Sequence, residues 1–510
     1  MFFRERNFPL LSKIHNNLNK THLYSYKKKT VMLTLTTMTL KKLFYTIIIS
    51  AVIFGCALAD KGYADKGYDI EARVNGVQDT VALLAYHFGN RQYIKDTVRT
   101  DHQGRFRFQG EESLDAGIYM VVLPGQKYFE ILVDDNQHFA LETEMDNFVN
   151  AMQFQNSPDN EAFYEYMQFI GSHNQRLSPA RAELQEETTS ETRRAEIRAM
   201  LEEADQLVKQ KQQEIIDNNP KGLFARILLA QREPELPDTP LREDGTPDNN
   251  LMYRQYKNAF WQNIDFADDR LLRTPLFHAK LNQFFTRVVV QIPDSIIAEA
   301  DYLVEKSRAH PEVFKYTVFF ITNTFERSQI MGMDAVFVHM VENYYMTGEA
   351  DWVTGEQLER ITERAMALKP LLIGKTAPDI TMFTPERNPL SLHDVDAEFT
   401  ILYFWDSECG HCKRQTPLLK DFYQRMQPKG VEIYAANTEA DREKWLNYVR
   451  ANNLQWLQVN DPANSSGFRD KYDIWATPLI FLLDKDKRIL AKRITVEQAE
   501  EIINREMARQ

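Results

Sequence analysis

Hydrophobic and polar positions divide the chain into three successive patterns. Between residues 68 and 150 short apolar runs and apolar–polar alternation are separated by Gly or Asp clusters, which predicts a small antiparallel β-sandwich. The clearest case is Phe106 and Phe108, which alternate with Arg105 and Arg107. From residue 151 to 370 apolar residues recur mainly at helical spacing, so we expect a mostly α-helical middle domain.

From residue 371 to 510 predicted strands and helices alternate. This order is typical of an α/β domain whose sheet is covered on both faces. The expected strands are 399–405, 431–436, 479–483 and 489–494, and the expected helices are 409–426, 442–451 and 496–507. The chain is therefore predicted to hold three domains, which agrees with its length of 510 residues.

Two features of the helical region lead to specific expectations. Ser157 followed by Pro158 is typical of a helix cap and a first-turn proline. Further on, apolar residues form one stripe that we expect to pack within its own domain. A coiled coil is the alternative, but the stripe lasts only about three heptads and Lys211 interrupts its seam. The stripe consists of Ile197, Met200, Leu201, Ala204, Leu207, Val208 and Ile215.

Residues 38–59 have the layout of a secretory signal peptide. Lys41 and Lys42 precede an apolar run that ends in Ala-Leu-Ala before Asp60. Met38 is then the start, residues 1–37 are a non-native upstream extension, and 60–67 are a flexible lead-in. Two alternatives stay open: an uncleaved membrane anchor, and a lipoprotein in which Cys56 is lipidated. Each alternative exports the chain.

Net charge and cysteine content argue against two classes of protein: nucleic-acid-binding proteins and small scaffolds held by several disulfides. The net charge is −12, and it becomes −20 once residues 1–59 are removed, because they contain nine Lys/Arg and one Glu. So acidic a chain repels phosphate backbones, which argues against nucleic acid as a partner. Of the three cysteines only Cys409 and Cys412 lie after the predicted signal peptide, so a framework of structural disulfides is excluded.

These two cysteines lie in "FWDSECGHCKRQTP", residues 404–417. Cys409 directly follows a predicted strand and opens a predicted helix, whose unpaired N–H groups favour a thiolate. Cys412 lies one turn further along the helix. We therefore expect Cys409 to attack a substrate disulfide and Cys412 to resolve the mixed disulfide that forms.

The residues next to the two cysteines are expected to have opposing effects on the stability of the Cys409 thiolate. His411 can place a positive charge beside the thiolate, whereas Glu408 and Asp406 place negative charge there. Gly410 permits close approach of a substrate backbone.

Three other uses of the two cysteines were weighed. A zinc site needs two more ligands, and the eleven histidines show no pair at ligand spacing. Haem attachment needs His directly after the second cysteine, where the chain has Lys413. Two merely structural cysteines are the third alternative. A redox-active disulfide, without metal or other cofactor, is favoured over all three.

Residues 371–510 resemble the TlpA/ResA-like thioredoxin-fold thiol-disulfide oxidoreductases of the bacterial cell envelope. The resemblance rests on "IGKTAPDI" (373–380), "ILYFWDSECGHCKRQTP" (401–417) and "ATPLIFLLDKDKRIL" (476–490). It implies a cis peptide bond between Thr477 and Pro478 beside Cys409, with Trp405, Thr477 and Pro478 orienting the substrate. More loosely, the β-domain and the helical region resemble domains that precede this one in envelope proteins.

The sequence departs from the family at several positions. Glu408 replaces a tryptophan, Gln415 a glutamate, and Tyr403 lies where thioredoxins hold a buried aspartate. The Gly-His dipeptide is shared with the more oxidising protein disulfide isomerases. Peroxiredoxins need Pro and Thr where this chain has Leu402 and Asp406, so peroxidase activity is not expected.

Together these features predict an exported enzyme of the periplasm or cell envelope that reduces disulfides in proteins, akin to enzymes of cytochrome c maturation. Its electrons are expected from a membrane thiol donor, and lipidation of Cys56 provides an anchor in one alternative. An oxidase or isomerase with the same site is the alternative within the class. A binding or scaffold protein is the alternative outside it, since most of the chain lies before residue 371.

Overall fold

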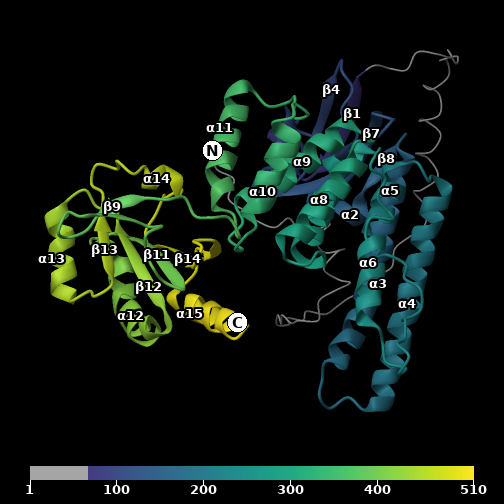
Figure 1. Cartoon of the computed structure of the whole chain (residues 1–510). Coiled ribbons are helices and arrows are strands. Elements are labelled where there is room, and N and C mark those ends of the chain that lie inside the picture. Colours follow the sequence, from purple (N-terminus) through teal and green to yellow (C-terminus); the bar gives the residue numbers. More distant parts are fainter. Residues whose placement is uncertain (1–66, 510) are drawn as a thin grey trace, which may run out of the picture. The chain divides into compact units, whose positions relative to one another are not determined.

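The computed structural model describes residues 67–509 (Figure 1). These residues form two compact units. The units meet in sequence between Glu233 and Pro234, and the short segment Phe88–Asn90 is grouped with the second. The expected domain limits at residues 150 and 370 thus fall inside the units. The predicted signal peptide, Cys56 and the lead-in up to residue 66 lie outside the described residues.

The first unit contains two four-stranded sheets, ordered β4-β1-β7-β8 and β3-β2-β5-β6. The predicted alternation is confirmed in β4, where Phe106 and Phe108 are buried while Arg105 and Arg107 are exposed. Ile70 of β1 pairs with Phe108 and is fully buried. The strands are β1 (Tyr68–Asn75), β2 (Val81–Phe88), β3 (Arg91–Arg99), β4 (Arg105–Gly110), β5 (Gly117–Leu123), β6 (Lys127–Val133), β7 (His138–Glu144) and β8 (Gln153–Gln155).

One detail of the β prediction is wrong. Strands β1 and β7 run parallel, with Ile70 opposite Phe139, so their sheet is mixed and not antiparallel throughout. A parallel pair needs a long crossover connection. The intervening strands β2 to β6 supply that crossover, which local alternation along the sequence does not reveal.

Helix α3 packs against strand β6. The side chain of Asn160, which is fully buried, accepts a hydrogen bond from the Leu132 N–H at 2.7 Å and donates one to the Leu132 carbonyl at 2.8 Å. The helix begins at Pro158 as predicted, but Ser157 caps no backbone N–H and instead accepts from the Asn160 amide. The helices of this unit are α2 (Phe148–Ala151), α3 (Pro158–Leu184), α4 (Glu191–Asn218) and α5 (Leu223–Gln231), with a 3₁₀ turn at Pro124–Gln126.

The apolar stripe of the helical region lies on α4, which packs against α3 and α5. Ile197 and Ala204 are buried, but Met200 and Leu207 are 38% and 40% exposed. The stripe is therefore only partly covered within this unit.

The second unit starts with a group of helices. Three of them, α7, α8 and α9, begin at Pro275, Pro293 and Pro311, where the missing N–H of proline costs no helical hydrogen bond. The helices are α6 (Asn249–Ala259), α7 (Pro275–Gln283), α8 (Pro293–Ser307), α9 (Pro311–Glu326), α10 (Asp334–Met340) and α11 (Gly355–Leu368), with short π or 3₁₀ segments at Asp269–Arg273, Phe284–Val288, Val341–Tyr345 and Lys369–Leu371.

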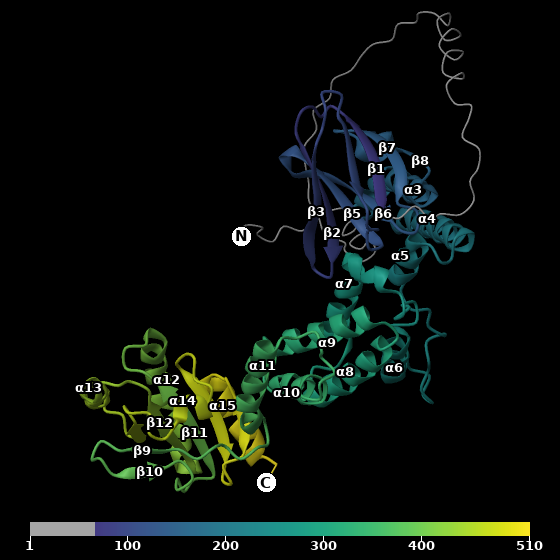
Figure 2. The same ribbon diagram turned by 90° about the horizontal axis from the view of Figure 1, so that it is seen from above.

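The same unit ends in a seven-stranded sheet ordered β10-β9-β13-β12-β11-β14-β15. Strands β9, β10, β11 and β12 of this sheet are labelled in Figure 2. The central strand β11 is buried at every residue, runs parallel to β12 and antiparallel to β14. The expected strands are all present, whereas β9, β10 and β13 were not predicted. The strands are β9 (Thr381–Phe383), β10 (Pro389–Ser391), β11 (Phe399–Trp405), β12 (Val431–Asn437), β13 (Leu457–Asn460), β14 (Leu479–Asp484) and β15 (Ile489–Lys492).

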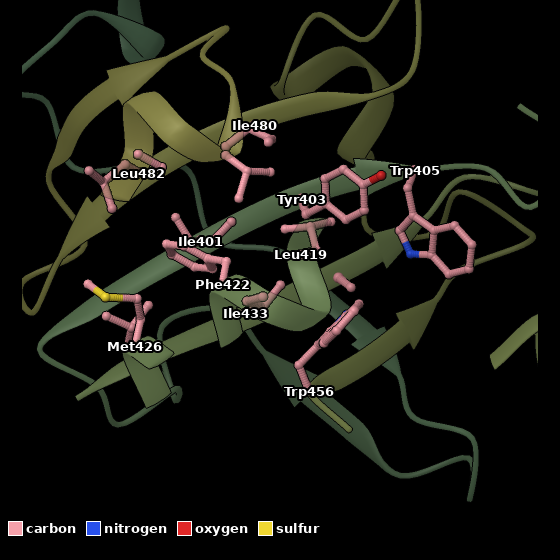
Figure 3. Packing of buried hydrophobic residues seen from close by; sticks show 14 of the residues in the cluster. Ile401, Tyr403, Trp405, Leu419, Phe422, Met426, Ile433, Trp456, Ile480 and Leu482 are labelled. Carbon is pink, nitrogen blue, oxygen red and sulfur yellow. The ribbon is translucent and has the colours of Figure 1, made fainter. Parts of the chain in front are cut away.

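Helices cover this sheet and define two cores. Odd-numbered residues of β11, such as Ile401 and Tyr403, pack with α12, α13 and α15. Leu402 and Phe404 pack on the other face with α14 and residues 371–395. Figure 3 shows the first core, in which Leu419 and Phe422 of α12 meet side chains of β11 and β14. The helices are α12 (Gly410–Met426), α13 (Arg442–Asn452), α14 (Phe468–Lys471) and α15 (Val496–Met507), with a 3₁₀ turn at Gln427–Lys429.

Within residues 67–509, every helix is too short or too polar to serve as a membrane-spanning segment.

Candidate active site

A tight turn carries the chain from β11 into α12. The Asp406 carboxylate accepts a hydrogen bond from the Glu408 N–H at 2.7 Å, and the Asp406 carbonyl accepts one from the Cys409 N–H at 3.2 Å. The Thr438 N–H donates to the Trp405 carbonyl at 2.8 Å and fixes the end of the strand. This turn places Cys409 at the N-cap position of α12. Asp side chains favour such turns because they imitate the backbone hydrogen bond.

The two cysteines are free thiols that lie together. The Cys409 sulfur accepts a hydrogen bond from the backbone N–H of Cys412 at 3.3 Å, as an N-cap side chain does. The Cys412 thiol also donates to the Cys409 sulfur. Cys409 is partly exposed, whereas Cys412 is 1% exposed. A substrate therefore has access to the first sulfur, and the second lies behind it.

The two thiols differ in acidity. Burial by itself raises the pKa of Cys409, but hydrogen bonds from Cys412, Thr477 and the His411 backbone outweigh it and hold the pKa below its ordinary value. Burial is also the main cause for Cys412, and it raises the pKa of that thiol to about 12. Only the thiolate is nucleophilic, so Cys409 is the more nucleophilic of the two thiols near neutral pH.

The loop before β14 lies beside the thiols. The Thr477–Pro478 peptide bond is cis, as the resemblance implied. The Cys409 thiol donates a hydrogen bond to the Thr477 carbonyl at 3.3 Å. That carbonyl is therefore within reach of any group bonded to the Cys409 sulfur. The expected roles of Thr477 and Pro478 in orienting a substrate stay predictions.

Three neighbours of the thiols take up distinct positions. His411 lowers the Cys409 pKa through its backbone N–H, while its ring accepts a hydrogen bond from Arg414 at 2.9 Å. Glu408 is exposed and lies 4.0 Å from Lys413. A Cβ added at Gly410 would meet no atom closer than 3.7 Å, so the local packing leaves room there. Effects of the His411 and Glu408 charges on the thiolate remain untested expectations.

Trp405 lies in the first core. Its side chain is 2% exposed and stacks on Tyr403 with 6.5 Å between ring centroids. Cys412 belongs to the same core. The expected role of Trp405 in orienting a substrate stays a prediction.

Tyr403 lies close to Cys412. Burial is the main cause that raises the pKa of Tyr403, and the nearby Cys412 raises it further. The phenol therefore stays protonated beside the Cys412 thiol.

Three residues beside the site were missed by sequence reasoning. Trp475 is 85% exposed only two residues before Thr477, and its indole N–H donates to Asp473 at 2.6 Å. Asp473 in turn is contacted by Arg364 of α11. The available signal was the position of Trp475 next to the expected cis-proline loop. Nothing local in the sequence connects Arg364 to it.

Between residues 67 and 509, no group of three or more His, Cys, Asp or Glu side chains is arranged to hold a metal ion. The expectation that the site works without a metal stays a prediction.

Fold and site together define a class, the thioredoxin-like proteins with a dithiol at the start of a helix. Residues 397–489 match the family model described as thioredoxin-like. The thiol-disulfide oxidoreductase ResA of Bacillus cereus is 27% identical over 130 residues, which are 26% of this chain and 74% of ResA. A thioredoxin-like protein of Haemophilus influenzae is 30% identical over 21% of this chain and 62% of its own length.

A solved structure is also similar. A domain of a possible thiol-disulfide isomerase from Cytophaga hutchinsonii is 43% identical, covering 27% of this chain and 95% of that domain with a TM-score of 0.26. The carboxy-terminal quarter of the chain is thus a thioredoxin-like domain related to the ResA/TlpA-like thiol-disulfide oxidoreductases.

Proposed function

We propose that this chain is an exported thiol-disulfide oxidoreductase that reduces disulfides in proteins of the cell envelope. The observation that carries the proposal is the difference between the two thiols. Cys409 is accessible and has a lowered pKa, while Cys412 behind it is buried and has a raised one. This arrangement suits a nucleophile and a resolving thiol.

The reaction balances as a two-electron exchange. The Cys409 thiolate attacks one sulfur of a substrate disulfide, that S–S bond breaks, and the departing sulfur takes up a proton. Cys412 then loses its proton and attacks the Cys409 sulfur, which releases the second substrate thiol. The protein disulfide is reduced, and the Cys409–Cys412 pair is oxidised. A thiol donor, for which we propose a membrane protein, returns the pair to its reduced form.

Export and location belong to the same proposal. The pattern of residues 38–59 supports passage to the periplasm or cell envelope, and lipidation at Cys56 would hold the chain at the membrane. Globomycin, which blocks lipoprotein signal cleavage, tests the anchor: a shift in electrophoretic mobility is expected for a lipoprotein and none after simple cleavage. A Cys56→Ser variant is the control.

Insulin reduction by the full chain tests the activity. With dithiothreitol as donor, the chain should accelerate precipitation of the insulin B chain, and Cys409→Ser should abolish the acceleration. An Arg425→Gln variant, which changes an exposed residue of the same helix, should retain it. Equal rates for the wild-type chain and Cys409→Ser would contradict the proposal.

The direction of electron flow depends on the reduction potential of the pair. A potential of about −270 mV, as in thioredoxin, favours reduction of substrate disulfides, whereas a potential of about −120 mV is that of a strong oxidant. Equilibration of the full chain with glutathione buffers measures it. An oxidising value would assign the same dithiol to an oxidase or isomerase.

A binding or scaffold function is favoured by one observation, namely that the family match spans only residues 397–489. Complementation separates this function from catalysis. A Cys409→Ala, Cys412→Ala double variant should fail to complement a deletion strain if the dithiol matters. Full complementation would assign the function to the rest of the chain.

A further inference from the structure

In the second unit, a cavity of about 560 Å³ is lined by the segment that directly precedes the loop with Thr477 and Pro478. One wall is helix α11, through Arg360, Arg364 and Ala367, and the other comes from the segment that ends at Trp475. The segment continues into Thr477, whose carbonyl lies 3.3 Å from the Cys409 sulfur. The segment that lines the cavity therefore leads, within two residues, to the residue that contacts the Cys409 sulfur.

Trp475 is the most exposed large apolar side chain of the described residues, at 85%. An indole is costly to leave in water, and tryptophan is among the residues that contribute most to binding when an interface covers it. A polypeptide whose disulfide reaches the Cys409 sulfur comes close to the Thr477 carbonyl, which lies 3.3 Å from that sulfur. Trp475 precedes Thr477 by two residues, so residues that flank the disulfide are the natural candidates to cover it.

The position of this indole is fixed before any substrate arrives. The indole N–H donates to the Asp473 carboxylate at 2.6 Å, and Arg364 contacts the same oxygen. Arg493 lies 3.6 Å from the second oxygen, and the Asp473 side chain is 5% exposed. Groups that are ordered in advance lose less entropy when a ligand binds. Helix α11 thus supports a surface of the redox domain.

The chemistry of the cavity points to one kind of ligand. Three arginines and three acidic residues line it, and the contact between Arg364 and Asp473 neutralises one of each. Balanced charge gives little preference for charged peptides. The apolar lining consists of Ala367, Ile474 and the exposed face of Trp475. The area that gains most from burial is therefore apolar.

We propose that Trp475 and this cavity bind a large apolar side chain that lies close in sequence to the reacting cysteine of the protein substrate. Arg364 acts as a positioning residue, through Asp473. This inference rests on the proposed function and specifies its substrate class. It also gives α11, which lies outside the family match, a part in substrate choice.

A pair of synthetic peptides tests the proposal on the full chain. Each peptide is closed by one intramolecular disulfide, and they differ only in Phe or Ser beside one cysteine. We expect wild-type kcat/KM to be about tenfold higher for the Phe peptide, through KM, and Trp475→Ala to abolish the difference. Trp475→Phe should keep most of it, and Arg364→Ala should reduce it.

Two controls make the outcomes separable. Phe319→Ala, which removes a half-exposed aromatic side chain from helix α9, should leave the preference unchanged. The Phe319→Ala variant should also reduce the small disulfide 5,5′-dithiobis(2-nitrobenzoate) at the wild-type rate, which shows that its dithiol is intact.

Equal kcat/KM for both peptides in the wild-type chain would overturn the inference while leaving the proposed function intact. A wild-type chain that reduces neither peptide nor the small disulfide would instead refute the proposed function. If Trp475→Ala converts a dimer into a monomer in sedimentation, the surface binds a second copy of the chain and the inference is also wrong.

Discussion

The backbone N–H of Cys412 points at the sulfur of Cys409 across 3.3 Å, so the first turn of α12 acts directly on the nucleophile. The same turn brings the Cys412 thiol behind that sulfur, into the core formed with Tyr403 and Leu419. Hydrogen bonds to Cys409, of which this is one, lower the pKa of that thiol, whereas burial raises the pKa of Cys412, although the two thiols are only three residues apart.

Alkylation should follow the order of the two pKa values. Raising the pH deprotonates a thiol, so a lowered pKa moves half-maximal reactivity to lower pH. Cys409 should therefore react with iodoacetamide at a lower pH than the same residue in the urea-unfolded chain. Cys412, measured in a Cys409→Ser variant, should need a higher pH than Cys409, because burial is the main cause of its raised pKa and remains in that variant. Mass spectrometry of peptides locates each modification, and reversal of the order would contradict the site geometry.

Trapping should depend on which thiol is removed. A Cys412→Ala variant keeps the accessible nucleophile but lacks the resolving thiol, so it should accumulate a mixed disulfide with oxidised glutathione. The matched Cys409→Ala variant should form at least about tenfold less adduct, since its remaining thiol is 1% exposed and has a raised pKa. Intact mass after a timed quench measures both. Equal adduct formation would show that Cys412 is also accessible.

A buried ion pair should matter for stability. Lys492 of β15 contacts Asp334 of α10, and their side chains are 6% and 16% exposed. Lys492→Met leaves a buried carboxylate without its partner, which costs about 3–5 kcal/mol. Lys369→Met removes the half-exposed pair with Glu342 and should cost at most about 1 kcal/mol. Urea unfolding followed by tryptophan fluorescence compares the two, and similar midpoints would be the contrary result.

The core beneath the dithiol offers a matched pair on one helix. Phe422 is 1% exposed and belongs to the first core, whereas Leu418 is 47% exposed. Phe422→Ala should lower the free energy of unfolding by about 3–5 kcal/mol, through lost burial and the cavity left behind. Leu418→Ala should change it by no more than about 0.5 kcal/mol. Equal losses in urea unfolding would mean that the packing shown in Figure 3 is wrong.

Local sequence patterns predicted the elements around the site closely. Strand β11 (Phe399–Trp405) and helix α15 (Val496–Met507) have the predicted limits. The strand is apolar at every position except Thr400, and the helix has a capped amphipathic pattern, so each segment marks its own ends. The short strands β9, β10 and β13 escaped prediction. Each has only three or four residues and is held by its neighbours in the sheet, so its own sequence carries little signal.

The residues that surround the dithiol were harder to assign. Trp405, whose role in orienting a substrate stays a prediction, lies in the core, whereas Trp475 was overlooked and is exposed. Both are tryptophans within a few residues of the motif or its loop. Their burial depends on which layer of the fold each one faces, and that is decided by segments distant in sequence.

By itself the sequence determined the dithiol, its place between a strand and a helix, and the order of a sheet-rich, a helical and a thioredoxin-like region. These follow from spacing and periodicity, which act over a few residues. Only the tertiary structure decided that β1 and β7 run parallel and that Arg364 of α11 supports Trp475 through Asp473. These contacts join residues 69 and 109 positions apart, so their energy depends on packing that no local pattern encodes.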